Sequence, residues 1–426
     1  MGTPPIAARA AWRAACAAAG CDGVTGAEEV PVEDACGRVT ADAVRAVWSA
    51  PAFACAAMDG IAVRAADTAT APVVLARGRF DEVDTGDPIP DGRDAVVMRE
   101  HLTRHADGAA TVPAPAAPGQ HVRPVGEDLH AGELLLPPGH RLRPVDLAAV
   151  AAGGHRVVRV RRRPVVAIVP TGDEVRPLGA DLARGEVLDT NSLMLSATLR
   201  RAGCIPRVAP VASDDPQRIA AAVRAAAMGA DLVAVLAGSS AGRDDHTARV
   251  VDALGSVVVH GVAVRPGHPV LLGMLTDPSS VPVIGVPGYP VSAALAAELF
   301  ALPLLAERQG VRPPRRPTCV VRLAADVPSP RQLEEYVLVG LDGTGAAVPL
   351  RRGAGVRTAL MRADGVLRIP VGDVGHRAGD RVEVERLLGS PDTAASVMSV
   401  VEAPTVADRR SPARPCAVGA VPPVHR

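Results

Sequence analysis

The middle third of the chain alternates short apolar runs with stretches that have helical periodicity. Strands alternating with helices of ten or so residues are typical of βαβ units in a parallel sheet. The sequence therefore predicts a central, doubly wound, mainly parallel α/β domain over residues 164–310. We expect strands at Val165–Val169, Arg207–Val211, Leu232–Leu236, Val257–Val259, Val270–Leu272 and Val283–Val286, and helices at Ser192–Arg201, Pro216–Met228, Asp244–Leu254 and Pro290–Leu305.

The pattern before residue 164 predicts two further domains. An Ala-rich helix is expected over residues 7–20 and a second helix, or a helix and turn, over Glu33–Val47. Short apolar runs cut by Gly, Pro and Asp indicate a small β domain over residues 51–124. After this β domain, a helix is expected at Val145–Ala152 and a strand at Val157–Val160. Residues 1–50 and 125–163 are therefore grouped as one helical and extended domain.

A stiff Arg- and Pro-rich linker at residues 312–317 marks the last domain boundary. Short strands separated by Gly and Asp turns follow it, and they predict a C-terminal β-barrel over residues 317–389. The segment 390–426 is rich in Ala, Ser, Pro and Arg without period, so we expect a disordered tail. The strands are expected at Cys319–Leu323, Tyr336–Val339, Ala346–Leu350, Val366–Ile369 and Arg381–Val384.

The composition narrows the classes of function. All 46 basic residues are arginine, and 46 acids balance them, so the formal charge is zero. A neutral chain has no global attraction for nucleic acid or an anionic membrane, which leaves small anions held by local basic patches. The sequence contains no uninterrupted run of 18 apolar residues, so it predicts no membrane span. The seven scattered cysteines lack a CxxC pair, which favours reduced thiols in the cytoplasm over a disulfide framework or a zinc site.

Two loops of the α/β domain carry candidate chemistry, because ligands of open α/β sheets bind where the strands end. The loop Pro170–Glu174 places two acids and a glycine after the first strand. Such carboxylates bind a metal or accept a hydrogen bond, although a solvated turn has the same composition. The loop Ala237–Asp245 offers backbone N–H groups to an anion at a helix N-terminus. Helix capping by Asp244 accounts for part of that second loop without a ligand.

Three other segments carry polar residues in rigid turns. Arg265 and His268 share one proline-containing turn and would bind phosphate or another oxyanion. In Pro287-Gly-Tyr-Pro-Val-Ser292 the proline at 290 suits the first turn of a helix, and Ser292 offers a hydroxyl. A proline-rigid loop with solvated side chains is the alternative in both cases. Asp214-Asp215-Pro216 has the pattern of a helix N-cap.

In their order and spacing, these motifs resemble the molybdopterin molybdenumtransferase family, which includes the MoeA and gephyrin E-domain proteins. The resemblance runs from about residue 28 to residue 388. It is carried by Ala57-Met-Asp-Gly60, Thr85-Gly-Asp-Pro-Ile-Pro90, Thr171-Gly-Asp-Glu174, Asp189-Thr-Asn191, Asp214-Asp215 and Pro287-Gly-Tyr-Pro-Val-Ser292.

The resemblance implies a cytoplasmic, four-domain homodimer that takes adenylylated molybdopterin and molybdate as substrates. Molybdenum is inserted into the dithiolene with Mg²⁺-dependent release of AMP, and the product passes to molybdoenzymes or other proteins of the cofactor pathway. The implied catalytic residues are Asp59, Thr85, Glu174, Asp214 and Asp245, of which Asp59, Glu174 and Asp245 would hold Mg²⁺. The implied cofactor-binding residues are Thr171, Gly172, Asp173, Gly238, Ser239, Ser240, Gly242, Arg265, His268, Pro287, Gly288, Pro290 and Ser292.

The chain departs from the family pattern at four places near the expected anion site. Arginine keeps the charge of a lysine and adds a planar fork of donors, whereas histidine is largely uncharged near neutral pH. Two functions therefore stay open: the transferase, and a non-catalytic paralogue that binds molybdopterin or an oxyanion as carrier or regulator. The departures are Ser239-Ser240 for Gly-Gly, Arg265 and His268 for two lysines, Tyr289 for Asn, and Ile61 for Tyr.

Overall fold

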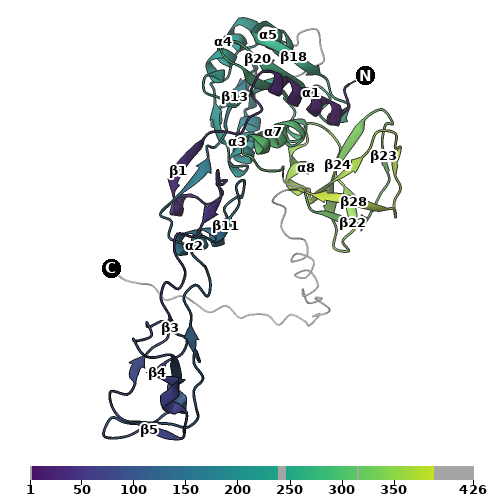
Figure 1. Cartoon of the computed structure of the whole chain (residues 1–426). Helices are drawn as coiled ribbons and strands as arrows, with labels where there is room; N and C mark the ends of the chain where they lie inside the picture. Colours follow the sequence, from purple (N-terminus) through teal and green to yellow (C-terminus); the bar gives the residue numbers. More distant parts are fainter. Residues whose placement is uncertain (1, 238–245, 314–315, 388–426) are drawn as a thin grey trace, which may run out of the picture. The chain divides into compact units, whose positions relative to one another are not determined.

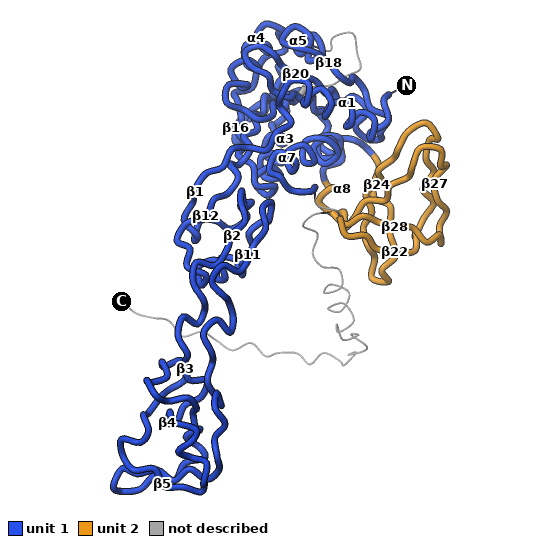
Figure 2. The backbone as a smooth tube through the Cα atoms, in the orientation of Figure 1, with its two compact units in different colours: residues 1–315, 353–357 blue, residues 316–352, 358–426 orange. Residues whose placement is uncertain are grey.

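The computed structural model describes residues 2–237, 246–313 and 316–387, which fall into two compact units (Figure 1). The first unit holds the chain up to residue 315 together with residues 353–357, and the second begins at residue 316 (Figure 2). The tail predicted at 390–426, the glycine loop at 238–242 and the helix start at Asp244 lie outside the described residues.

The central sheet of the first unit has the strand order β16-β13-β17-β21-β20-β18. β16, β13, β17 and β21 are parallel, and β20 and β18 join antiparallel at one edge. The predicted mainly parallel sheet is thus confirmed. β16 begins and ends earlier than predicted, because Pro210 lacks the N–H that a longer strand would use. The strands are β13 Val165–Pro170, β16 Ile205–Val208, β17 Leu232–Ala237, β18 Gly255–His260, β20 Leu271–Leu275 and β21 Val281–Pro287.

Helices cover both faces of this sheet (Figure 1). α4 (Pro216–Ala227) and α5 (His246–Leu254) lie on one face, where their apolar side chains and alternate strand residues such as Val169 and Val233 form a buried cluster. α3 (Thr190–Arg201) and α6 (Pro290–Ala296) lie on the other face. The alternation of strand and helix predicted from the sequence is therefore present.

The last helix of this domain continues from α6 through a π-helical turn, Ala297–Ala301, into α7 (Leu302–Arg308). Its 19 residues are long and apolar enough to cross a membrane by length and composition, but 72% of its apolar window is buried inside the protein. Such burial is typical of the core helix of a large α/β domain.

The N-terminal helix α1 (Pro5–Ala18) packs against β18 and β20 of the α/β sheet. Its buried stripe includes Trp12, whose indole N–H donates to the carbonyl of Gly273 at 2.9 Å. From the sequence, this helix is expected in one domain with residues 125–163 instead. The local pattern predicts the helix but does not indicate which sheet covers its apolar stripe.

The helix predicted over Glu33–Val47 is wrong. That segment has only a 3₁₀ turn, Val32–Asp34, and a short strand, Val44–Arg45. Gly37 has φ +74°, which an α-helix does not accommodate, and the buried hydroxyl of Thr40 donates to the carbonyl of Pro137. The elements around it are β1 Ala27–Pro31, paired with β12 Val157–Arg161, β2 Val44–Arg45, paired with β11 Leu134–Leu136, and α2 Pro144–Ala152.

The small β domain predicted between residues 51 and 124 contains two sheets, β6-β4-β7 and β5-β9-β8. Ile61, Val97 and Val112 lie in its buried core. The elements are β3 Cys55–Ala56, β4 Gly60–Val63, β5 Val73–Leu75, β6 Asp81–Val83, β7 Ala95–Met98, β8 Thr103–Arg104, β9 Ala110–Val112 and β10 Val122–Arg123, with 3₁₀ turns at Ala65–Thr68 and Arg99–His101.

The second unit contains an antiparallel sheet in which β24, β26, β28 and β22 follow one another, and β25 pairs with β24. The five strands predicted there are confirmed, whereas helix α8 (Arg357–Arg362) was not predicted; its first residue is the last one that belongs to the first unit. The strands are β22 Thr318–Arg322, β23 Val327–Pro328, β24 Glu334–Leu341, β25 Ala347–Pro349, β26 Gly365–Ile369, β27 Gly375–His376 and β28 Arg381–Arg386.

A buried carboxylate ties three distant segments of the first unit together. Asp231, which precedes β17, is only 6% exposed and accepts hydrogen bonds from Arg162, Arg308 and the backbone N–H of Val165. Burial would raise the pKa of Asp231, but the hydrogen bonds from Arg162 and Val165 outweigh it, so the pKa lies below its ordinary value. This stabilisation is present above the ordinary carboxyl pKa and is lost as the pH falls through the lowered one.

We predict that Asp231→Ala lowers the free energy of unfolding by about 3 kcal/mol, the low end of the range for a broken buried ion pair, because Arg162 stays partly solvated. Asp277→Ala is the matched control, since Asp277 and Arg224 form an ion pair at 2.7 Å with both side chains about half exposed. We expect it to cost about 0–1 kcal/mol. Urea unfolding measures both, and equal losses would contradict the role of Asp231.

Candidate functional site

The loop after β13 presents a carboxylate at the carboxyl edge of the sheet. Thr171 is buried, and its hydroxyl donates to the carbonyl of Leu236 at 3.0 Å, which fixes the loop to the end of β17. Gly172 has φ +135°, and a Cβ on it would lie 2.9 Å from Oε2 of Glu174. Glycine is favoured here because residues with a Cβ rarely adopt this φ, and the Glu174 carboxylate lies folded back beside it.

Two carboxylates join this loop to the loop before α4. The backbone N–H of Asp173 donates to Oδ2 of Asp214 at 3.3 Å, and the N–H of Asp214 donates to Oδ1 of Asp173 at 3.2 Å. The N-cap of α4 is Asp215, whose carboxylate accepts from the N–H groups of Gln217 and Arg218. Because Asp215 alone caps the helix, Asp214 is left to face the strand-edge loop.

The start of α3 contributes a second pair of polar side chains. Asp189 is the N-cap and accepts from the N–H of Ser192 at 2.9 Å. The amide nitrogen of Asn191 donates to the carbonyl of Gly288 at 2.6 Å, which holds the turn after β21. The other amide atom, Oδ1 of Asn191, is buried without a hydrogen-bond partner in the described part of the chain.

These elements enclose a pocket of about 90 Å³ at the ends of β13 and β17. It brings together three residues expected at the site from the sequence. Its polar and glycine lining consists of Thr171, Glu174, Asp189, Thr190, Asn191, Gly288 and Arg357.

Asp59 and Thr85 contact each other in the small β domain. Both the backbone N–H and the hydroxyl of Thr85 donate to Oδ1 of Asp59, at 2.7 and 2.8 Å. These two hydrogen bonds, with the nearby charge of Arg99, hold the pKa of Asp59 below its ordinary value. A Cβ on the next residue, Gly60, would lie 2.0 Å from the carbonyl oxygen of Val97, so only glycine permits this packing of β4 on β7. Asp59 is thus a fixed, ionised carboxylate.

The turn at residues 265–268 contacts the backbone of Val262 and Gly2 near the N-terminus through the imidazole of His268. Nδ1 of His268 lies 2.7 Å from the carbonyl oxygen of Val262, and a Cβ on Gly2 would lie 2.9 Å from the imidazole ring. Arg265 is the last residue of β19 (Val264–Arg265), and its side chain is exposed. Ser292, on the first turn of α6, is buried.

The turn after β21 also follows the pattern expected from the sequence. Pro287 ends β21, and Pro290 is the first residue of α6. Tyr289 is 62% exposed and lies against Gly355, where a Cβ would come within 3.3 Å of its ring. The ring therefore packs on residues 353–357 and does not fill the pocket behind Gly288.

Several expected site residues have no described position: Gly238, Ser239, Ser240, Gly242 and Asp245. Among residues 2–237, 246–313 and 316–387, no three His, Cys, Asp or Glu side chains converge as a metal site. The expected metal set of Asp59, Glu174 and Asp245 includes a residue outside the described ranges, so this set stays a prediction. Hydrogen bonds and ion pairs there do not join Asp59 and Thr85 to the strand-edge pocket.

Sequence reasoning missed Arg357 and gave Asp189 and Asn191 no role. The motif Asp189-Thr-Asn191 was visible, and its position before a helix could have indicated the cap and the amide. Arg357 carries no such signal, because it lies in sequence between β25 and β26 of the second unit, while residues 353–357 belong to the first unit. Only the folded chain brings it to the pocket.

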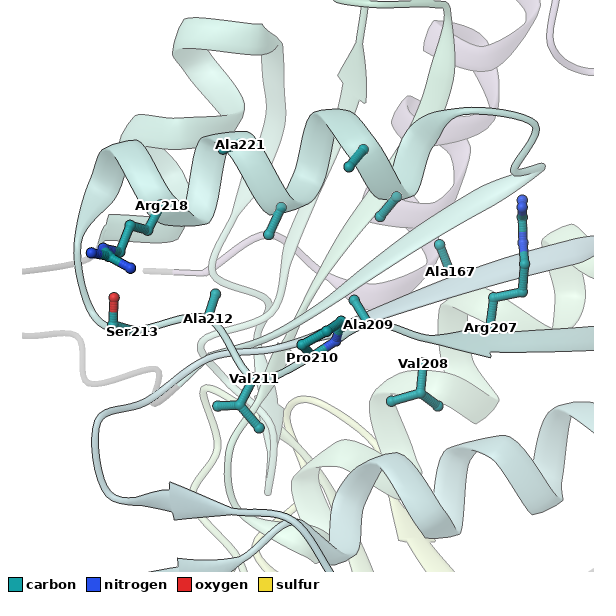
Figure 3. Close-up of a pocket in the computed structure, with 13 residues that line it drawn as sticks. Ala167, Arg207, Val208, Ala209, Pro210, Val211, Ala212, Ser213, Arg218 and Ala221 are labelled. Atoms are coloured by element: carbon teal, nitrogen blue, oxygen red, sulfur yellow. The ribbon is translucent and has the colours of Figure 1, made fainter.

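A larger groove of about 540 Å³ lies between α4 and the edge strand β16 (Figure 3). Alanines of α4, such as Ala221 and Ala225, form one wall, and the segment from Arg207 to Ser213 forms the other. Its lining includes neither a carboxylate nor a histidine. The groove is therefore a poor site for the acid and metal chemistry expected at the strand edge.

The fold and the pocket define a multidomain α/β protein with a small polar ligand site at the carboxyl edge of its sheet. Three family models match the chain in order: "MoeA N-terminal region (domain I and II)" at residues 6–154, "Probable molybdopterin binding domain" at 167–307, and "MoeA C-terminal region (domain IV)" at 320–387. The chain belongs to the MoeA family.

Individual relatives agree with the family models. The molybdopterin molybdenumtransferase 2 of Mycobacterium tuberculosis is 33% identical over 386 residues, covering 83% of this chain and 94% of the relative. The molybdopterin molybdenumtransferase of Synechococcus elongatus is 31% identical, covering 84% and 94%. The crystal structure of a molybdopterin biosynthesis MoeA protein from Pyrococcus horikoshii has a TM-score of 0.78 at 32% identity, covering 91% and 100%.

We predict that Thr85→Val raises the pKa of Asp59 toward its ordinary value, because one of two hydrogen bonds to the carboxylate is lost. Thr85→Ser keeps that bond and is the control. Carboxyl ¹³C chemical shifts followed through a pH titration measure the change. If Asp59 has the same pKa in the valine and serine variants, the hydroxyl of Thr85 does not lower the pKa of Asp59.

Proposed function

We propose that the chain inserts molybdenum from molybdate into adenylylated molybdopterin and releases AMP, as a molybdopterin molybdenumtransferase of molybdenum cofactor biosynthesis. Family membership supports the enzyme class, since the relatives of Mycobacterium tuberculosis and Synechococcus elongatus carry that name. The observation that carries the proposal is the strand-edge pocket, where Thr171, Glu174 and Gly288 meet in the domain that matches the molybdopterin-binding model.

The strand-edge loops supply the polar groups that orient the substrate. Gly172 keeps the backbone of residues 171–173 free of side-chain bulk, and Asp173 and Asp214 hold the two loops at a fixed separation. The substrate's phosphates would lie near the loop 238–242, with Arg265 and His268 as anion ligands. Pro287, Pro290 and Ser292 would shape the adjacent turn. Arg265 is the stronger of these anion ligands, because a guanidinium presents a planar fork of donors that an imidazole lacks.

Mg²⁺ fits the donor chemistry of this edge. Magnesium in phosphate-processing sites binds one or two carboxylates and completes its shell with water and substrate phosphates. Glu174 and Asp214 are carboxylates of that kind, and Asp59 and Asp245 belong to the proposed set. When bound, the ion neutralises the charge of the phosphoanhydride that water cleaves to give AMP. The hydrogen bonds from Thr85 lower the pKa of Asp59 and so favour the negatively charged form of this carboxylate.

We further propose a cytoplasmic homodimer, in which the small β domain of one subunit supplies Asp59 and Thr85 to the strand edge of the other. The absence of hydrogen bonds between the two groups in the described residues of one chain agrees with this arrangement. The second unit would be the barrel domain of the family, and molybdoenzymes or other pathway proteins would receive the product.

We predict that purified protein releases AMP from adenylylated molybdopterin only when molybdate and Mg²⁺ are both added. Asp59→Asn should slow the release by about 10²-fold or more, the cost of removing one preorganised group at a reacting phosphate. Asp91→Asn is the control, because Asp91 is an exposed carboxylate of the same domain. Chromatographic quantification of AMP gives the rates.

Two results would contradict the proposal. If the protein binds the nucleotide but releases no AMP under any of these conditions, it is a molybdopterin-binding carrier or regulator. If AMP is released at the same rate by Asp59→Asn and the unaltered protein, the chemistry does not use the carboxylate of the small β domain.

A further inference from the structure

The pocket at the strand edge is too small for a whole cofactor. Its volume of about 90 Å³ compares with roughly 300–1,000 Å³ for pockets that bury drug-sized ligands. It therefore admits one small group, such as a tetrahedral oxyanion, while the remainder of a larger ligand lies beyond its mouth.

The charge in the pocket comes from Arg357. Arg357 is an exposed residue that lines the pocket together with Glu174 and Asp189, and its side chain forms neither an ion pair nor a hydrogen bond with any residue that the structure describes. The carboxylate of Asp189 is already used by the N–H of Ser192. Arg357 thus keeps its planar fork of donors available, and that fork matches the oxygens of phosphate-like anions.

The backbone around Arg357 is fixed by the turn after β21. The N–H of Val291, in the first turn of α6, donates to the carbonyl of Ala354 at 3.0 Å, and the N–H of Arg357 donates to the carbonyl of Gly355 at 3.0 Å. Gly355 lies against the ring of Tyr289. The arginine is therefore held at the same turn that Asn191 fixes through Gly288.

A second polar atom of the pocket also lacks a partner. Oδ1 of Asn191 is buried without a hydrogen-bond donor among the described residues, while the amide nitrogen is used by Gly288. A buried acceptor without a donor costs free energy that a ligand, or a water bound to it, would recover. Because the oxygens of a tetrahedral oxyanion are themselves acceptors, the group that satisfies Oδ1 of Asn191 would be a bound water that donates to both, while Arg357 supplies the donors to the anion.

We infer that Arg357 binds a doubly charged tetrahedral oxyanion in this pocket and so acts as a specificity-determining residue for the anionic part of the substrate. The inference rests on the proposed function for the identity of that anion, which is either the substrate's phosphate or molybdate itself. Both present tetrahedral oxygens to the guanidinium. Arg357 thereby supplies positive charge to a pocket whose other charged residues are the acids Glu174 and Asp189.

The test compares Arg357→Ala, Arg357→Lys and the control Arg351→Ala, an exposed arginine of the same stretch of chain that does not line the pocket. Inorganic phosphate and sodium molybdate are titrated into each protein by calorimetry, with thermal unfolding as a check on folding. We expect Arg357→Ala to weaken the binding of at least one anion about tenfold or more, Arg357→Lys to restore part of it, and Arg351→Ala to change neither.

The outcomes separate the sources of the anion. A loss for molybdate alone assigns the pocket to the metal oxyanion, and a loss for phosphate alone assigns it to the substrate's phosphate. Equal affinities of Arg357→Ala and the unaltered protein for both anions, or no binding by the unaltered protein, would overturn the inference.

The AMP assay distinguishes this inference from the proposed function. If Arg357→Ala loses anion binding while the unaltered protein releases no AMP, the anion site stands and the transferase proposal fails. If the unaltered protein releases AMP and Arg357→Ala does so with an unchanged KM for both substrates, the inference fails and the transferase proposal stands.

Discussion

The parallel pairing of β16, β13, β17 and β21 is the constraint on which the site depends. Because these strands run in one direction, their carboxyl ends meet at one edge, and the described loops that follow β13, β16 and β21 are brought to the same edge although they are far apart in sequence. Thr171 bonds to the end of β17, and Asn191 bonds to the turn after β21. Each loop is held by a neighbouring strand end, so the pocket is a product of the sheet topology.

Glycine and carboxylate positions act together at this edge. Gly172 accepts a backbone conformation that brings the Glu174 carboxylate over the loop, and the reciprocal bonds of Asp173 and Asp214 hold two loops that both carry negative charge. An acidic edge of this kind needs cations before it can bind phosphates. Metal ions and the arginines of the edge are the available sources, since the chain contains no lysine.

Much of the fold could be predicted from the sequence, because strands such as Val165–Pro170 are continuous apolar runs and α4 has strong helical periodicity. The segment Glu33–Val47 could not, because Gly37 and the buried Thr40 hold it in an irregular path through long-range contacts. Local pattern carries no information about such partners.

Only those residues of the candidate site that belong to recognisable sequence motifs could be predicted from the sequence. The loop Thr171–Glu174 and Gly288 follow strands in the sequence, so their meeting at one edge follows from the parallel sheet. Arg357 could not be foreseen, because a return of residues 353–357 to the first unit leaves no periodic or compositional trace. A site residue on a short segment that leaves one unit to pack in the other can be identified only from the three-dimensional structure.

The central claim is that a molybdopterin ligand binds at the carboxyl edge of the central sheet. Backbone hydrogen–deuterium exchange, measured with and without purified molybdopterin, tests it most directly. We expect slower exchange on binding in residues 171–175, 189–192 and 288–292, with the β16 and α4 segments unchanged. Protection confined to the groove beside α4, or to the small β domain, would contradict the claim.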